Sequence, residues 1–98
     1  GGFYTTLMVG IDPRLKAGSC FFGAGGLQLG NNWVPYPAKD AAWAERWAKT
    51  LDPAWRLAQV KTPMNWCTGT NDFAYWMPAL MHTVKTAAGP VQLALKPN

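Results

Sequence analysis

The sequence has few charged residues and no long apolar segment, and each scarcity excludes a class of protein. Asp, Glu, Lys and Arg make up 14% of the 98 residues, while 49% are hydrophobic, which is typical of one small globular domain. No apolar run approaches the roughly 20 residues of a transmembrane helix, so we expect no membrane contact. The opening "GGFYTTLMVG" has no basic leader and suggests an excised piece rather than a signal peptide, and localisation stays undetermined.

Metal and nucleotide motifs are also missing. Cys20 and Cys67 lie in separate apolar runs without Cys-x-x-Cys spacing, so we expect buried free thiols rather than a zinc site. The five carboxylates are Asp12, Asp40, Glu45, Asp52 and Asp72. Their spacing does not resemble a metal-ligand pattern, and we predict no metal. The segment "GAGGLQLG" lacks the Gly-Lys-Ser/Thr ending of a phosphate-binding loop, so we expect no cofactor.

The charge balance is mildly basic. Nine Lys and Arg against five Asp and Glu give a formal charge of +4, but the basic residues form no run. A scattered positive charge is typical of a solvated surface, so we expect no nucleic-acid partner. Binding of nucleic acid or another anionic ligand stays an alternative, and it would require a steep salt dependence.

What the chain does have is a regular alternation of predicted elements and six tryptophans. The predicted elements are a helix over residues 1–10, a strand in 17–25 buried on both faces, a loop over 25–37, a helix over 38–51, a strand over 61–70, a helix from Pro78 to about Ala87 and a strand over 91–96. Helices alternating with strands predict an α/β fold with about three parallel strands and flanking helices in a three-layer arrangement. Ligands of such sheets bind at the carboxyl ends of the strands.

The segment "AKDAAWAERWAKTL" is the clearest helix. Trp43, Trp47 and Leu51 recur along one face, while Asp40 near its start and Lys49 near its end suit the helix dipole. A turn at Asp52-Pro53 follows.

The segment "CTGTNDFAYW" contains the candidate site. The predicted strand ends just after Gly69, and Asn71 and Asp72 follow it at the end of the sheet where ligands bind. Asp72 is therefore either a catalytic acid held at the carboxyl end of a strand, or a turn residue. In the second interpretation Asn71 and Asp72 accept backbone amides and cap the following helix.

Several stretches together resemble the carboxyl-terminal part of an α/β-hydrolase of the prolyl-oligopeptidase-like, acetyl xylan esterase or dienelactone hydrolase-like branches. Gly1 and Gly2 resemble the closing glycines of a Gly-x-Ser-x-Gly-Gly elbow, which makes residues 1–10 the helix after the nucleophile. The segment "LDPAWRLAQVKTPMNWCTGTNDFAYW" resembles the strand that delivers the acid of the triad, and it implies that Asp72 is this acid. "TAAGPVQLALKPN" resembles the final strand, so residues 60–98 run from the acid-bearing strand to the last strand.

The resemblance covers residues 1–98 as one partial domain, with 26–52 as a variable loop and helix. The family's serine would precede Gly1 and its histidine would follow Asn98, so we expect the isolated chain to be inactive. His82 does not match the family's histidine and is interpreted as a surface or packing residue. Ser19 has no elbow motif and is not a candidate nucleophile.

Three functions therefore stay open. The chain is part of a serine hydrolase acting on esters or peptides, a self-associating or partner-binding module without catalysis, or an anion binder. Exposed sheet edges and aromatic surface predict a homo-oligomer or a complementary hydrolase segment as partner. The substrate is undetermined. The aromatic residues that either pack in the core or line a pocket beside Asp72 are Trp33, Tyr36, Trp43, Trp47, Phe73, Tyr75 and Trp76.

Overall fold

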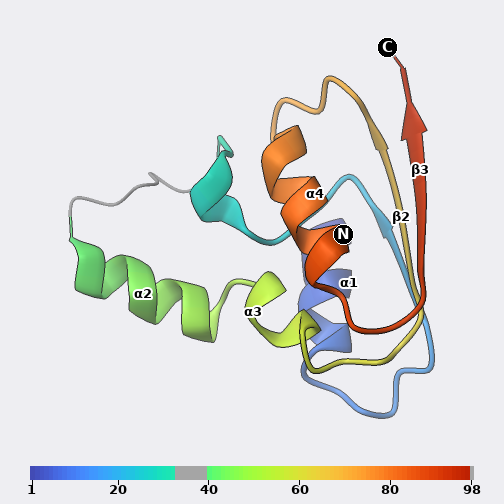
Figure 1. Cartoon of the computed structure of the whole chain (residues 1–98), viewed down its shortest axis with the longest axis horizontal. Helices are drawn as coiled ribbons and strands as arrows, with labels where there is room; N and C mark the ends of the chain where they lie inside the picture. Colours follow the sequence, from blue (N-terminus) through green and yellow to red (C-terminus); the bar gives the residue numbers. More distant parts are fainter. Residues whose placement is uncertain (33–39, 98) are drawn as a thin grey trace.

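A computed structural model describes residues 1–32 and 40–97 of the chain (Figure 1). Its elements follow the order α1 (Gly2–Val9), β1 (Gly18–Phe21), the 3-10 helix η1 (Leu27–Leu29), α2 (Ala41–Thr50), α3 (Ala54–Leu57), β2 (Met64–Gly69), α4 (Met77–Thr86) and β3 (Val91–Lys96). The predicted anchors Trp33 and Tyr36 lie outside the described residues.

The three strands form one parallel sheet in the order β1-β2-β3. In its register, Cys20 on β1 lies beside Trp66 on β2, which lies beside Leu93 on β3. The intervening helices return the chain to the same end of the sheet each time, as parallel pairing requires. The predicted fold class is confirmed as α/β, with three parallel strands in one sheet and flanking helices.

One face of the sheet carries the hydrophobic core. Figure 1 shows α1, α3 and α4 on the same side of the sheet, with α2 farther out. Val9, Cys20, Leu57, Trp66 and Leu80 are all buried between these helices and the strands. Burying a large apolar side chain contributes roughly 2–3 kcal/mol, so this layer contact is the main source of stability.

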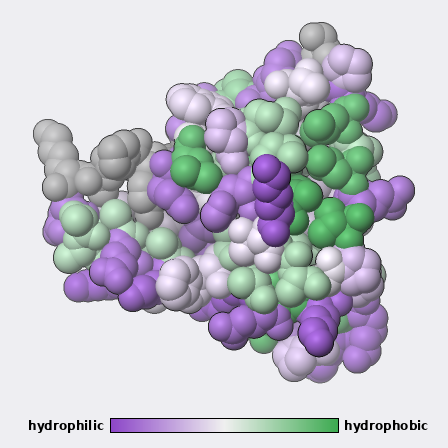
Figure 2. All heavy atoms as spheres, viewed as in Figure 1, coloured by the Kyte–Doolittle hydropathy of each residue, from purple (hydrophilic) through white to green (hydrophobic). Residues whose placement is uncertain are grey.

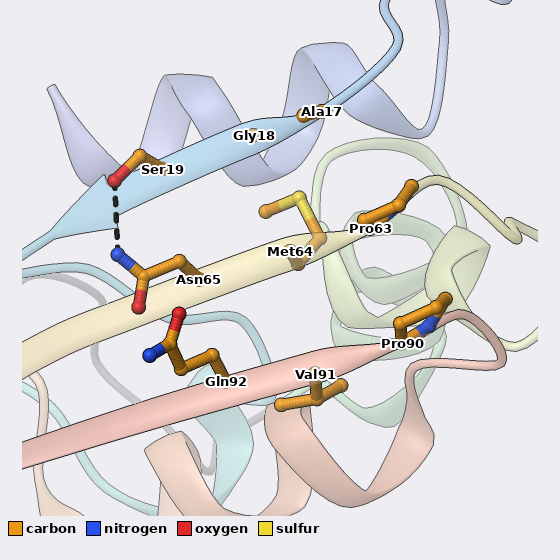
Figure 3. Close-up of a pocket in the computed structure, with 9 residues that line it drawn as sticks. All are labelled: Ala17, Gly18, Ser19, Pro63, Met64, Asn65, Pro90, Val91 and Gln92. Atoms are coloured by element: carbon orange, nitrogen blue, oxygen red, sulfur yellow. Dashed lines mark hydrogen bonds between the residues drawn. The ribbon is translucent and has the colours of Figure 1, made fainter.

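The opposite face of the sheet has no helix over it within residues 1–32 and 40–97 (Figures 1 and 3). The prediction that the first strand is buried on both faces is therefore wrong: Ser19 and Phe21 of β1 are exposed, and Cys20 between them is buried. Successive strand residues point to opposite faces, so this alternation is what a one-sided cover produces. The described residues thus supply a helical layer and a sheet layer.

Element ends follow local sequence signals. Pro78 lies in the first turn of α4, and β3 begins at Val91 directly after Gly89 and Pro90, as predicted. Asp40 caps α2 by accepting the backbone amides of Ala42 and Trp43 at 2.9 and 3.2 Å.

Two local features were missed. The chain turns at Asp52-Pro53 as predicted, but the residues after this turn form the short helix α3, which was not predicted. The aromatic face of α2 is not buried, because α2 packs mainly on α3, and Trp43 and Leu51 are exposed. No helix within the described ranges is both long and apolar enough to cross a bilayer.

Candidate functional site

The turn after β2 holds the candidate site. The strand ends at Gly69, and the amide of Asp72 donates to the Gly69 carbonyl at 3.2 Å, which closes a tight turn at the carboxyl end of the central strand. This places the Asp72 side chain beside the end of β2, where the sequence predicted it.

Three donors fix the Asp72 carboxylate. Its Oδ1 accepts the backbone amides of Ala74 at 2.9 Å and Tyr75 at 3.1 Å. Its Oδ2 accepts the hydroxyl of Thr68 at 2.9 Å. Each carboxylate oxygen has two acceptor positions, so Oδ1 is filled, while among the described residues Oδ2 receives a side-chain donor only from Thr68. The carboxylate is oriented, and the part of the chain that the structure describes leaves one acceptor position on Oδ2.

A cleft of about 440 Å³ lies against this carboxylate. Its walls are formed by Phe22, Gly69, Asn71, Asp72, Phe73, Ala74 and Tyr75. Burial raises the pKa of the Tyr75 phenol, and the negative charge of Asp72 raises it further, because both disfavour the phenolate. Three of the seven lining residues are thus aromatic, and one is a carboxylate.

The start of α1 packs against the end of β1 at the same edge of the sheet. A Cβ on Gly23 would lie 2.5 Å from the backbone of Gly2 and Phe3, so only glycine allows this approach of two backbones. The Cys20 thiol donates to the Gly2 carbonyl at 3.2 Å. Burial raises the pKa of Cys20, so this thiol stays protonated as a donor.

The predicted aromatic residues divide into two groups. Phe73 and Tyr75 line the Asp72 cleft, and Trp76 supports it by donating its indole Nε1 to the Phe73 carbonyl at 3.0 Å. Trp43 and Trp47 belong to α2 and form no part of the cleft lining.

Ser19 and His82 lie away from Asp72. Ser19 is on the uncovered face of the sheet, where its hydroxyl accepts from Asn65 Nδ2 at 3.1 Å. Asn65 in turn lies beside Gln92 on the next strand (Figure 3). His82 lies in α4, and its ring is so close to Gly26 that a Cβ there would meet it at 2.7 Å. This contact agrees with the interpretation of His82 as a packing residue.

Sequence reasoning missed the role of Asp52. This carboxylate is 2% exposed and accepts the amides of Gly26, Leu27 and Ala54 at 2.7, 2.9 and 2.9 Å. Gly26 has a φ of 64°, a backbone conformation that suits glycine. The amides of the "GAGGLQLG" segment that could have faced a phosphate thus bind a carboxylate of the chain itself. The sequence signal for this role was the Asp-Pro pair at the start of a helix. It could not reveal the two amide donors of Asp52 that lie 26 and 25 residues away along the chain.

The turn interpretation of Asp72 is half right. Asp72 does accept two backbone amides, as a turn residue would. It does not cap α4, whose cap residue is Trp76 and has no side-chain cap hydrogen bond. The missed contributor here is Thr68, whose hydroxyl restrains Oδ2.

Across the described part of the chain, no three His, Cys, Asp or Glu side chains gather closely enough to hold a metal ion. The sequence matches no protein-family model, and no curated protein is significantly similar to it.

Proposed function

We propose that these 98 residues form part of a serine hydrolase that cleaves esters or peptides, with Asp72 as the acid of its triad. The observation that carries this proposal is the Asp72 carboxylate itself. It lies at the carboxyl end of the central parallel strand, is held by three donors, and keeps an acceptor position on Oδ2 among residues 1–32 and 40–97. A triad acid needs these properties, because it must orient an imidazole through one accepted hydrogen bond.

The start of α1 supports the same proposal. Gly2 packs backbone to backbone on Gly23, so a residue preceding Gly1 would enter at the edge of the sheet where Asp72 lies. A nucleophile elbow turns from a strand into a helix at this edge, and it needs small residues at the close approach.

The chemistry then divides among residues inside and outside this segment. A serine preceding Gly1 would attack the substrate carbonyl, and a histidine beyond residue 98 would take its proton. Asp72 would accept the Nδ1 hydrogen of that histidine on Oδ2 and stabilise the imidazolium. The Ala74 and Tyr75 amides and the Thr68 hydroxyl would keep the carboxylate in position.

Native mass spectrometry of the protein from its source, with a denatured intact mass beside it, tests the proposal. We expect a longer chain or a bound companion polypeptide with a serine that reacts with a fluorophosphonate. Asp72→Asn in that assembly should lower kcat by about 10⁴-fold, the effect of the same change in a well-known serine protease, without preventing assembly. A homogeneous oligomer of the 98-residue chain, with no labelled serine, contradicts the proposal.

A second candidate is self-association through the uncovered face of the sheet. Phe21 is 57% exposed there, in register with Cys67 on β2, which lies beside Ala94 on β3. Figure 2 also shows apolar residues gathered on the side of the molecule where the strands lie. An uncovered apolar sheet surface favours packing against a second copy.

Sedimentation velocity distinguishes this candidate. Phe21→Lys should convert an oligomer to a monomer, because it places a charge in the contact. The matched control is Phe22→Lys, which replaces the neighbouring exposed ring. Phe22 belongs to the Asp72 cleft and not to the proposed contact, so this variant should keep the oligomer. A monomeric wild-type chain contradicts self-association.

A further inference from the structure

Two phenylalanine rings at the Asp72 cleft are unusually exposed. Phe22 is 61% and Phe73 is 73% exposed, and both line the cleft, from the segments that follow the neighbouring strands β1 and β2. Exposed apolar rings that converge on one cleft are typical of a binding site, whereas scattered single ones are not.

The backbone under both rings is restrained. Phe22 has a φ of 53°, a conformation that costs a bulky residue of order 1–3 kcal/mol, and its amide donates to the Cys67 carbonyl at 3.1 Å. The Phe73 carbonyl accepts both from Trp76 Nε1 at 3.0 Å and from the side-chain amide of Asn32. Both rings thus extend from restrained turns, which reduces the backbone entropy lost when a ligand enters the cleft.

We propose that this cleft binds an aromatic group of the substrate that carries no negative charge, of the phenyl or benzyl ester class. The inference rests on the hydrolase function proposed above and adds its substrate class. About 440 Å³ is ample for a single ring, since a buried cavity of about 150 Å³ holds benzene. The Asp72 carboxylate in the wall repels carboxylate-bearing ligands, so the group bound carries no negative charge. Phe22 and Phe73 are specificity residues that pack on its ring.

The test is an amide NMR titration of the chain with three probes of one shape: benzyl alcohol, benzoate and benzylamine. Benzyl alcohol should give saturable shifts at Gly69 and residues 71–75, and benzoate should bind at least about fivefold more weakly. Phe22→Ala and Phe73→Ala should each weaken benzyl alcohol binding about fivefold, which corresponds to the roughly 1 kcal/mol of one aromatic contact.

Phe21→Ala is the matched control. It removes an equally exposed ring from the adjacent residue, but this ring lies outside the cleft, so benzyl alcohol affinity should not change. Asp72→Asn should narrow the difference in affinity between benzyl alcohol and benzoate, because it removes the negative charge from the wall of the cleft. Equal losses in the Phe21 and Phe22 variants, benzoate binding as tight as benzyl alcohol, benzylamine as the weakest probe, or no saturable shift would each overturn the inference.

Failure of this inference is separable from failure of the proposed function. The titration measures binding without any reaction, and the fluorophosphonate label measures the serine without this cleft. A labelled serine with no aromatic binding overturns only the substrate class. Binding of the aromatic probe in an assembly with no labelled serine contradicts the proposed hydrolase function.

Discussion

Asp52 and Asp72 are two aspartates in similar turns with different environments. Each accepts on Oδ1 the backbone amide of the second residue after it: Ala54 for Asp52 and Ala74 for Asp72, both at 2.9 Å. Both are followed by an aromatic residue and a helix. From the sequence alone, the segments "LDPAW" and "NDFAYW" predict the same turn chemistry.

The difference lies in the donors and in solvent. Asp52 is 2% exposed and receives three amide hydrogens, two of them from the loop at Gly26 and Leu27. Asp72 is half-buried, and its Oδ2 takes a hydroxyl, which can rotate, instead of an amide, which cannot. A carboxylate enclosed by fixed donors holds a fold together. A carboxylate oriented by a rotatable donor beside an open cleft is suited to a further partner.

Asp52→Asn should have the largest effect on stability. The new carboxamide oxygen can accept two amides, but its NH₂ group would then face the N–H of Leu27, which loses its acceptor. Leaving a buried donor unpaired costs about 1–3 kcal/mol, and loss of the charge-assisted bonds adds to it, so we expect about 2–4 kcal/mol less free energy of unfolding. Urea unfolding followed by circular dichroism measures it. A loss below about 1 kcal/mol would contradict a structural role for Asp52.

Thr83→Val should come next. The Thr83 hydroxyl is fully buried, accepts the Gly25 amide at 2.9 Å and donates to the Ala79 carbonyl at 2.7 Å. Valine has nearly the same shape and leaves the Gly25 amide unpaired, so we expect a loss of about 2 kcal/mol. Thr83→Ser is the control, because it keeps the hydroxyl. If serine and valine cost the same, the effect comes from packing and not from the hydrogen bond.

Asp72→Asn and Thr68→Val should cost least, about 1 kcal/mol or less each in the same urea assay. In Asp72→Asn the oxygen keeps both amides, and the Thr68 hydroxyl can rotate to accept from the new NH₂ group. Thr68 is 4% exposed, but its substitution by valine removes one hydrogen bond whose acceptor, Asp72, is only half-buried and can bind water instead. A loss at Asp72 as large as that at Asp52 would remove the distinction between the two carboxylates and favour a purely structural turn.

Much of the fold was predictable because its signals are local. Pro78 in a first helical turn, Gly89-Pro90 before a strand and the apolar run into Gly69 each fix an element within a few residues. The position of Asp72 followed from the same local pattern together with the rule that parallel strands end at one edge.

The parts that were missed depend on distant contacts. Asp52 binds amides 25 and 26 residues earlier, and no periodicity in the sequence reports such a pairing. The exposed face of β1 was missed because "SCFF" is apolar enough to be covered on both sides, and the cover depends on where other helices lie. The Thr68 hydroxyl on Asp72 depends on the shape of the turn between them.

The smallest effect we expect is on the titration of Tyr75, which reports the charge in the cleft. Burial raises its pKa above the ordinary value of about 10, and the Asp72 charge adds to this. Asp72→Asn should therefore lower the pKa of Tyr75 part of the way, while burial keeps it above the ordinary value; a ¹³Cζ-tyrosine NMR titration measures the change.

A raised pKa of Tyr75 in the folded state favours the neutral phenol, so the stabilisation it gives is complete below pH 10 and is lost as pH rises through the folded pKa. The alkaline loss should be smaller in Asp72→Asn, while the buried Cys20 contributes equally to both proteins. Asp52→Asn should leave the pKa of Tyr75 unchanged, and an equal shift in both variants would mean that the charge at Asp72 is not the one Tyr75 senses.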